Sequence, residues 1–203
     1  MMFRPRPSPH ISLIPLFFLF LTLTVYAQAD TPKIEQEVIG TLPNAMVDGT
    51  LVFSGYSAHY AFVTGSIGKQ TVVLDGTPQD RPFKQIGNIR FAPSTHKLFY
   101  WALDISGGKE TIVLVADGTV IKTDFSGEGS LIFSDDGTQW VIIRGESNGV
   151  TVMLNGKKLG IYADATWPRF SPDGKHVAFL AKDKTGKISV LVDGKAERSF
   201  EPP

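Results

Sequence analysis

The segment PRFSPDGKHVAFLAKDKTGKISVLVDG, residues 168–194, carries the signals that decide the fold of this 203-residue chain. Phe170 ends a short first strand, and the SPDG tetrapeptide after it supplies the proline and glycine of a tight turn. The apolar run at Val177–Ala181 is typical of a strand covered on both faces. A glycine-bearing hairpin leads to a third strand at Ile188–Val192, and Asp193-Gly194 favours a hairpin turn into a fourth.

The same order of signals occurs three more times, from Leu51, Ile89 and Leu131. The marker phenylalanines are Phe53, Phe91, Phe133 and Phe170, at spacings of 38, 42 and 37 residues. The matching closing turns are Asp75-Gly76, Asp117-Gly118, Asn155-Gly156 and Asp193-Gly194. The earlier second strands are predicted at Tyr60–Val63, Leu98–Ala102 and Trp140–Ile143. Four strands in about 40 residues are typical of a propeller blade. We therefore predict an all-β chain that forms a β-propeller of about four four-stranded blades. An incomplete ring and a ring completed by a partner are both alternatives to a closed ring of four.

Two further expectations concern the blades. Fourth strands are predicted to be short and polar, as at Pro82–Ile86, Lys158–Tyr162 and Glu197–Phe200, because outer strands lie at exposed edges. The tryptophans are expected in the core rather than in a ligand platform, because they lie on or beside predicted strands. They are Trp101, Trp140 and Trp167.

The first 29 residues resemble a cleaved secretory signal. Arg4 and Arg6 form a basic head, an apolar run covers Ile11–Val25, and Ala27-Gln28-Ala29 is a small-x-small cleavage site. The apolar run is short for a membrane span and Pro15 interrupts it, so we expect no stable membrane insertion after cleavage, with an uncleaved anchor as the alternative. The predicted organisation is a signal at 1–29, a lead-in at 30–50, in which Lys33–Leu42 could form an outer closing strand, and the propeller at 51–203. The product is expected in the periplasm or outside the cell.

Composition limits the chemistry. The chain has no cysteine, so disulfides and thiol chemistry are excluded. Its formal net charge is 0, and loss of the two signal arginines would make it −2. This balance gives no electrostatic reason to expect a nucleic acid as partner. No cofactor, metal or catalytic residue is predicted.

The phrase FSPDGK at 170–175, the Val-Ala-Phe strand after it and the late Val-Asp-Gly resemble propeller repeats of the TolB-type, WD-like family. The resemblance extends from Leu51 onward and implies a propeller with a protein-interaction role in the periplasm. The chain departs from the family in three respects. Residues 30–50 are too few for the α/β domain of TolB, the Gly-His and Trp-Asp dipeptides of WD repeats are absent, and family propellers usually have more blades than four.

The turns after the marker phenylalanines are the candidate binding loops, because propellers present variable loops on a rigid frame. These loops are 54–58, 93–96, 135–138 and 172–175, and we expect them on one rim. The candidate binding residues are Tyr56, His59, His96, Asp135, Asp136, Asp173 and His176. Turn formation is the simpler interpretation of the acids, and capping of backbone groups is that of the histidines.

Three functions remain open from the sequence. The favoured hypothesis is an exported, non-enzymatic scaffold that binds a protein partner or another ligand. The alternative is an enzyme acting on glycans or peptides, or a fragment of a larger propeller hydrolase, with Asp136, Asp173, His59 and His176 as its polar groups. A third possibility is a homodimer that shares eight blades.

Overall fold

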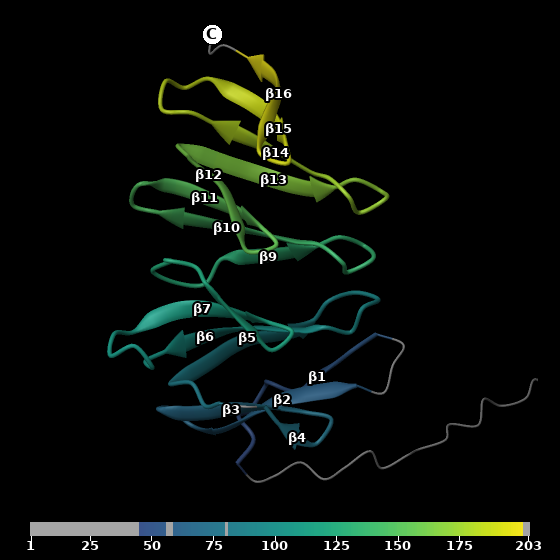
Figure 1. Cartoon of the computed structure of the whole chain (residues 1–203), viewed down its shortest axis with the longest axis vertical. Coiled ribbons are helices and arrows are strands. Elements are labelled where there is room, and N and C mark those ends of the chain that lie inside the picture. The colour runs from purple at the N-terminus through teal and green to yellow at the C-terminus, as the bar shows by residue number, and fades with distance from the viewer. Residues whose placement is uncertain (1–44, 56–58, 80, 201–203) are drawn as a thin grey trace, which may run out of the picture. The chain divides into compact units, whose positions relative to one another are not determined.

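The computed structural model describes residues 45–55, 59–79 and 81–200, and the structural statements refer to these residues. The chain divides into two compact units, Met1–Ile39 and Gly40–Pro203, and the described residues lie in the second. Every regular element among them is a β-strand (Figure 1). None of the described residues forms a helix that is long and apolar enough to cross a membrane. The predicted outer strand at Lys33–Leu42, the predicted signal and Tyr56 lie outside the described residues.

The strands form four antiparallel sheets of four, and each sheet is one predicted blade. Within every sheet the strands follow chain order, so each blade is a simple meander (Figure 1). The first blade contains β1 (Val52–Phe53), β2 (Tyr60–Ser66), β3 (Lys69–Leu74) and β4 (Thr77–Pro78). The second contains β5 (Gln85–Phe91), β6 (Leu98–Asp104), β7 (Thr111–Ala116) and β8 (Thr119–Lys122). The third contains β9 (Ser130–Phe133), β10 (Trp140–Glu146), β11 (Gly149–Leu154) and β12 (Lys157–Tyr162). The fourth contains β13 (Asp164–Phe170), β14 (Val177–Lys182), β15 (Ile188–Val192) and β16 (Lys195–Phe200).

The closing turns have the backbone that the sequence predicts. In each turn both residues have positive φ, from 49° at Asp75 to 83° at Gly194. Two successive residues with positive φ make the tight hairpin turn whose twist matches that of the flanking strands. Aspartate or asparagine followed by glycine is the pair that adopts this conformation at the lowest cost.

The predicted fourth strand of the first blade is wrong. The outer strand of that blade is β4, only two residues long, directly after the closing turn. Residues 85 and 86 instead begin β5, the first strand of the second blade. Phe83 lies between β4 and β5 and forms an isolated bridge with Gln70 of β3. The two strands are therefore separated by an irregular segment in which Pro82 has no N–H to donate to a ladder.

Two of the first strands are longer than predicted because each contains a bulge. The register of β5 against β6 shifts between Gly87 and Arg90, and that of β13 against β14 shifts between Thr166 and Arg169. Trp167 lies in the second bulge with a φ of 55° and is 73% exposed. The prediction that it belongs to the core is wrong, because the bulge turns its side chain to solvent. Trp101 and Trp140 are buried, as predicted.

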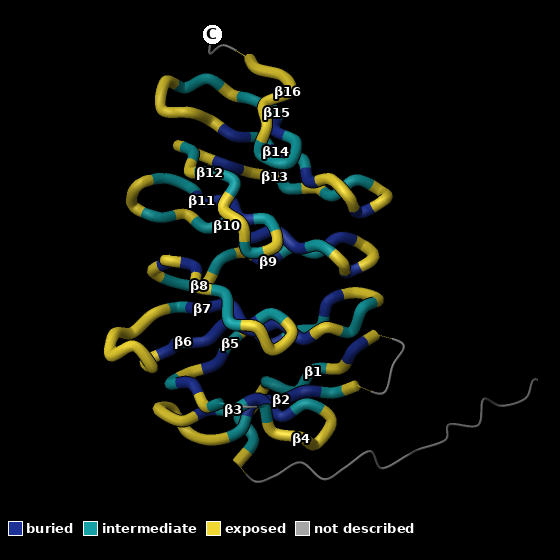
Figure 2. Tube along the Cα trace, viewed as in Figure 1, coloured by how far each residue is buried: buried dark blue, intermediate teal, exposed yellow. Residues whose placement is uncertain are grey.

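The core lies between successive blades. Ile142 and Val141 are neighbours on β10 and both are fully buried. Because alternate residues of a strand point to opposite faces, Ile142 packs in a cluster with the second blade and Val141 in a cluster with the fourth. This double burial explains the continuously apolar second strands (Figure 2).

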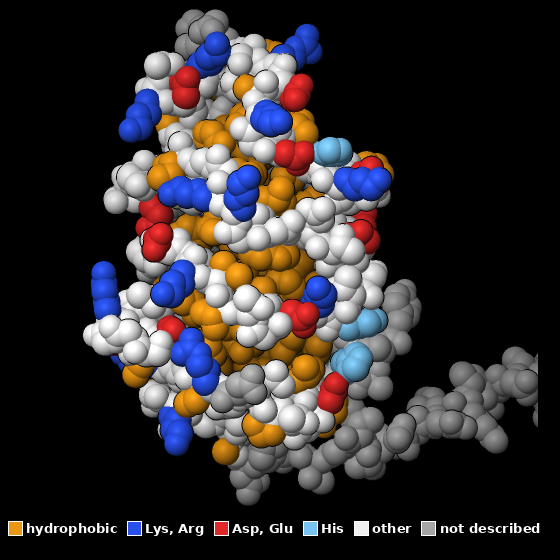
Figure 3. Space-filling view, in the orientation of Figure 1, with side chains coloured by type: hydrophobic (Ala, Val, Ile, Leu, Met, Phe, Trp, Pro, Cys, Tyr) orange, Lys and Arg blue, Asp and Glu red, His pale blue; other side chains and the backbone are white. Residues whose placement is uncertain are grey.

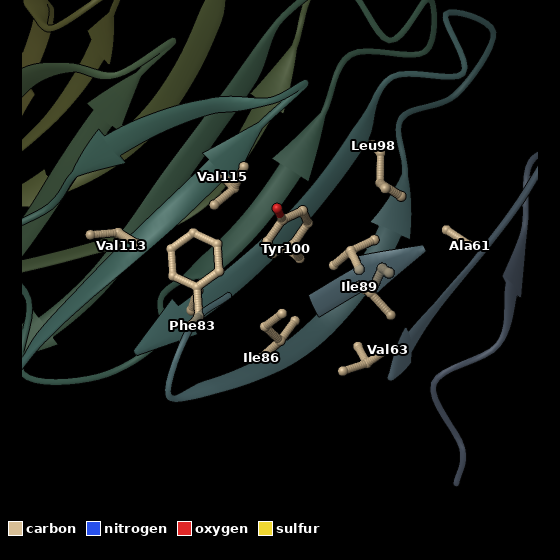
Figure 4. Close-up of a cluster of buried hydrophobic side chains, with 11 residues drawn as sticks. Ala61, Val63, Phe83, Ile86, Ile89, Leu98, Tyr100, Val113 and Val115 are labelled. Carbon is tan, nitrogen blue, oxygen red and sulfur yellow. The ribbon is translucent and has the colours of Figure 1, made fainter. Parts of the chain in front are cut away.

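Three buried clusters hold the blades together. The first joins the first and second blades around Val63 and Tyr100 (Figure 4), the second joins the second and third, and the last joins the third and fourth. Among the described residues, none of these clusters joins the fourth blade to the first.

Candidate functional site

Apart from Tyr56, which lies outside the described residues, the predicted binding residues lie at the edge of the sheets where the turn after each marker phenylalanine meets the closing turn of the same blade. In all four blades the residue after the marker donates its backbone N–H to a carbonyl five residues later, as from Ser134 to Gln139 and from Ser171 to His176. The histidine side chains gather along this edge (Figure 3). We call this edge the turn rim. The shared hydrogen bond gives the four turns the same frame.

Asp136 and Asp173 are the structural acceptors of their turns. Asp136 accepts hydrogen bonds from the Ser134 hydroxyl at 2.5 Å and from the Thr138 hydroxyl at 2.8 Å. Asp173 accepts from the Ser171 hydroxyl at 2.5 Å. These serine hydroxyls are the main reason that the pKa of each carboxyl lies below its ordinary value. Both acids are therefore anionic and engaged within their own turns.

Neighbouring turns contact one another along the rim. The Thr95 hydroxyl of the second blade donates to the backbone carbonyl of Gly137 in the third at 3.2 Å. The Ser94 hydroxyl donates a long hydrogen bond, of 3.4 Å, to the backbone carbonyl of Asp135. The rings of His59 and His96 lie side by side, with centroids 5.9 Å apart. The rim thus brings candidate residues of adjacent blades together.

His59 and His176 each bind an aspartate that the sequence reasoning did not connect with them. The Nδ1 of His59 lies 2.6 Å from an Asp75 oxygen, and that of His176 lies 2.7 Å from an Asp193 oxygen. The other carboxylate oxygen accepts the backbone N–H that opens the second strand, for example from Val177 at 3.0 Å. The third blade has the uncharged equivalent, in which Asn155 donates to Gln139 at 2.8 Å. These pairs join the two turns of one blade.

The pair of His176 with Asp193 predicts that the stability of the fold depends on pH. Asp193 accepts a hydrogen bond from His176 and thereby raises the pKa of His176. The pair therefore stabilises the fold most at pH values low enough for this imidazole to be charged in the unfolded chain as well. That contribution is lost as the pH rises through the pKa of His176 in the folded state. We expect Asp193→Asn to lower the pKa of His176 in an NMR titration of its ring protons. Asp117→Asn, in another blade, is the matched control, and an unchanged pKa in Asp193→Asn would show that the pair has no electrostatic weight.

A cleft lies at the opposite edge of the sheets, between the second and third blades. It has a volume of about 560 Å³ and lies around the β6–β7 hairpin and the segment that connects β8 to β9. A smaller cleft of about 220 Å³ adjoins it and shares Glu146 and residues 122–125. The side chains that give the cleft its chemistry are those of Lys109, Glu110, Ile112, Lys122, Phe125 and Glu146. We call these two connected hollows the inter-blade cleft.

Asp104 holds one end of the cleft in place. Arg81 donates two parallel hydrogen bonds to its carboxylate, at 2.9 and 2.8 Å, and Ser106 donates through its backbone N–H at 2.9 Å. The Arg81 guanidinium is the main reason that the pKa of Asp104 lies well below its usual range. Asp104 is nearly buried, so these bonds compensate the loss of its hydration. The ion pair fixes the start of the hairpin that borders the cleft.

Glu146 holds the side that belongs to the third blade. It accepts hydrogen bonds from the backbone N–H and the hydroxyl of Ser126, at 3.0 and 2.7 Å, and from Arg144 at 3.1 Å. The Ser126 hydroxyl is the first cause of the lowered pKa of Glu146. Arg144 also donates to the backbone carbonyl of Glu128 at 2.8 Å. This network ties the β8–β9 connection to β10 and fixes the Arg144–Glu146 ion pair at the cleft.

The sequence contains one signal for the cleft, outside the predicted binding loops. Asp104 and Glu146 both lie 13 residues after their marker phenylalanines, at the ends of equivalent second strands. Asp183 follows the second strand of the fourth blade and accepts backbone hydrogen bonds from Thr185 and Lys187. An acidic residue at this position in three repeats points to the edge opposite the turn rim. Only the fold shows that two of these acids border one hollow.

The inter-blade cleft is chemically suited to binding. Its lining combines the apolar side chains of Ile112 and Phe125 with basic and acidic side chains. Glu110 is paired with Lys84, and Glu146 is held by Ser126 and Arg144. Among the described residues, no group of three or more histidine, aspartate or glutamate side chains is placed to hold a metal ion.

Comparison with known proteins yields fold similarities at low scores. No family model and no curated protein matches the chain. TolB from Acinetobacter baumannii is 17% identical with a TM-score of 0.38, over 79% of this chain and 44% of its own. A protein assigned as TolB from Agrobacterium tumefaciens is 16% identical with a TM-score of 0.34, over 81% and 64%. A protein assigned as a 6-phosphogluconolactonase from Bacteroides uniformis ATCC 8492 is 18% identical with a TM-score of 0.32, over 69% and 51%. The chain thus spans less than two thirds of each of these structures.

Proposed function

We propose that the chain is an exported, non-enzymatic propeller scaffold that binds a short extended segment of a protein partner in the inter-blade cleft. The cleft itself is the observation that carries this proposal. Its volume of about 560 Å³ is within the range of sites that enclose small ligands or short peptide segments. The loops that line it are held in place, because the networks of Asp104 and Glu146 fix them to the ends of β6 and β10. A preformed site of this kind loses little entropy when it binds.

The charges of the cleft favour a polypeptide. Lys109 and Lys122 line the cleft together with Glu110, Glu146 and apolar side chains. A peptide offers both signs of charge together with apolar side chains, whereas a nucleic acid offers a single sign. On the face drawn in Figure 3, basic and acidic side chains are likewise interspersed. Mixed charge therefore supports selection among peptide sequences.

The strand at the cleft also favours an extended segment. β8 ends at Lys122, which pairs with Val113, so Thr111 and Ile112 of β7 continue beyond their outer neighbour. In the third blade the outer strand β12 covers β11 as far as Val150. The short β8 thus leaves the first residues of β7 without a paired outer strand beside the cleft, where the Thr123 hydroxyl donates to the Ile112 carbonyl at 2.8 Å. An extended peptide adds to such an edge through its backbone, while its side chains enter the hollow.

Export is supported by the sequence of residues 1–29, with their basic head, short apolar run and small-x-small site. These residues lie outside those that the structure describes. We propose the periplasm or the extracellular space as the location of the processed chain.

The proposal predicts that reversing a charge weakens peptide binding when the residue lies in the cleft and not when it lies on the turn rim. The full chain is applied to an array of 15-residue peptides that covers cell-envelope proteins, and the captured peptides are measured in solution. Lys122→Glu is expected to weaken the binding of the captured peptides at least 10-fold, because it reverses one charge in both parts of the cleft. Lys175→Glu is the matched control, since Lys175 is an exposed lysine on the turn rim.

Two results would contradict the proposal. If Lys175→Glu abolishes binding and Lys122→Glu does not, the turn rim is the site. If the captured peptides are cleaved by the purified chain, the protein is an enzyme and the scaffold function is wrong.

A further inference from the structure

The three interfaces inside the chain follow one rule. Each blade has a leading face, which packs on the blade before it, and a trailing face, which packs on the blade after it. In the third blade Ile142 lies on the leading face and Val141 on the trailing face, and both are fully buried. The fourth blade repeats this pattern on one side only, since Val177 and Phe179 pack against the third blade.

The marker phenylalanines belong to the leading faces. Phe133 packs edge-on against Phe99 of the preceding blade, with ring centroids 4.8 Å apart. Phe91 and Phe170 are likewise packed in the clusters that join their blades to the preceding ones. Phe53, the marker of the first blade, is 60% exposed. Farther out on the same face Phe62 and its cross-strand partner Val73 are buried, so the open part of this face is confined to the inner strand.

The trailing face of the fourth blade is open as well. It consists of the side chains that alternate with those packed on the third blade, namely Ala178, Leu180, Val190 and Val192. None of these is fully buried, whereas Val141 and Val152 on the trailing face of the third blade are 0% exposed. Ile188 and Phe200 pair across the same face and are 41% and 48% exposed. Exposed apolar side chains concentrated on one sheet face indicate an interaction surface.

We propose that the occupant of each open face is a second copy of this chain, placed end to end, so that the fourth blade of each copy packs on the first blade of the other. Phe53 of one copy then lies over Ala178 of the other, as Phe133 lies over Phe99 within the chain. Phe99 and Ala178 hold the same place, the second residue of their second strands. The two copies form two equal contacts and close a ring of eight blades, a number that propellers adopt.

A second copy fits better than an unrelated protein, because the exposed marker of the first blade and the trailing face of the fourth are the two sides of a contact that the chain already makes at its other three markers. An interface between different surfaces of identical subunits closes into a ring when its rotation allows, and that closure leaves no open face. The proposal is independent of the inter-blade cleft, which lies between the second and third blades of a single copy.

Cysteine crosslinking tests the proposal directly, since the chain contains no native cysteine. The double variant Phe53→Cys/Ala178→Cys of the full chain is treated with a short bifunctional maleimide. We expect a covalent dimer from the double variant and none from either single variant. Dimers from Ala178→Cys alone would mean that two fourth blades meet face to face, and this result would overturn the end-to-end arrangement.

Molar mass measured by light scattering gives the second test. We expect the full chain to have twice the mass of one chain, and Ile188→Lys or Phe53→Asp to shift it to one chain with unchanged circular dichroism. Both side chains are exposed in the single copy, so these changes leave the fold of each copy intact. Ile105→Lys is the control, because Ile105 is 48% exposed on an inner blade. A strict monomer at all concentrations, or an open series of larger assemblies, would overturn the proposal.

Discussion

Replacing Gly137 with alanine is expected to destabilise the fold by about 3 kcal/mol. Gly137 has a φ of 66°, a conformation in which an L side chain is strained. A Cβ at this position would also overlap the backbone carbonyl of Pro93 in the preceding blade. Because that neighbour is backbone and is fixed by the turn rim, the clash can be relieved only by separating the second and third blades. Thermal and urea unfolding of the full chain measure the loss.

A matched glycine separates the two causes. Gly118 has a φ of 77°, and a Cβ added there would meet open space, with no atom beyond its chain neighbours within 4 Å. Gly118→Ala therefore carries the backbone strain without the clash, and we expect this control to cost about 1 kcal/mol. If both variants unfold at the same denaturant concentration, the turns do not pack across the rim as described, and the stacking of the blades at this edge is wrong.

The second large effect is expected from Ile142→Ala. Ile142 is 0% exposed between the second and third blades, in the cluster that contains Trp101 and Phe99. Shortening it removes most of a buried side chain and leaves a cavity that rigid sheets cannot fill, at a cost of about 3 to 4 kcal/mol. For a domain of this size, such a loss corresponds to a decrease in Tm of roughly 10 °C.

Ile105→Ala is the control for this prediction. Ile105 lies directly after β6 and is 48% exposed, so its shortening is expected to change the free energy of unfolding by less than about 0.5 kcal/mol. Equal losses from the two isoleucines would mean that the second strand of the third blade is not covered on both faces, and the interpretation of the continuously apolar runs would fail.

Much of the blade could be predicted because its signals are local and occur four times. The apolar run at Val177–Ala181 predicts a strand covered on both faces, and β14 has that position. The Asp-Gly and Asn-Gly turns are predicted from the φ values that these residues tolerate, and all four have positive φ. These features depend on residues within one repeat, so a single sequence specifies them.

The errors arise where one residue departs from the repeat or where distant residues meet. Trp167 is exposed because a bulge in β13 turns its side chain to the solvent side of the strand, and no local motif marks that bulge. The fourth strand of the first blade is displaced because β4 ends after two residues. His59 pairs with Asp75, 16 residues later, and His176 with Asp193, 17 residues later, and each pair joins two turns of one blade. Register across strands decides such contacts, and sequence spacing alone does not give it.

The inter-blade cleft could not be predicted because it belongs to two repeats at once. Asp104 ends β6 in the second blade and Glu146 ends β10 in the third, and each is visible in the sequence as the end of a strand. Their common hollow depends on the short β8 and on the Ser126 hydrogen bonds to Glu146. On the turn rim the fold brings His59 and His96 together, whereas Asp136 and Asp173 are engaged in their own turns.

The measurement that tests the central claim most directly is a map of backbone amide NMR shifts in the full chain as the tightest array peptide is added. The binding of an extended segment in the inter-blade cleft predicts that the largest shifts fall at residues 109–113, 122–126 and 146–151, with little change at 134–138 and 171–175. The reverse pattern, with the shifts confined to the turn rim, would contradict the account and return the binding site to the turns after the marker phenylalanines.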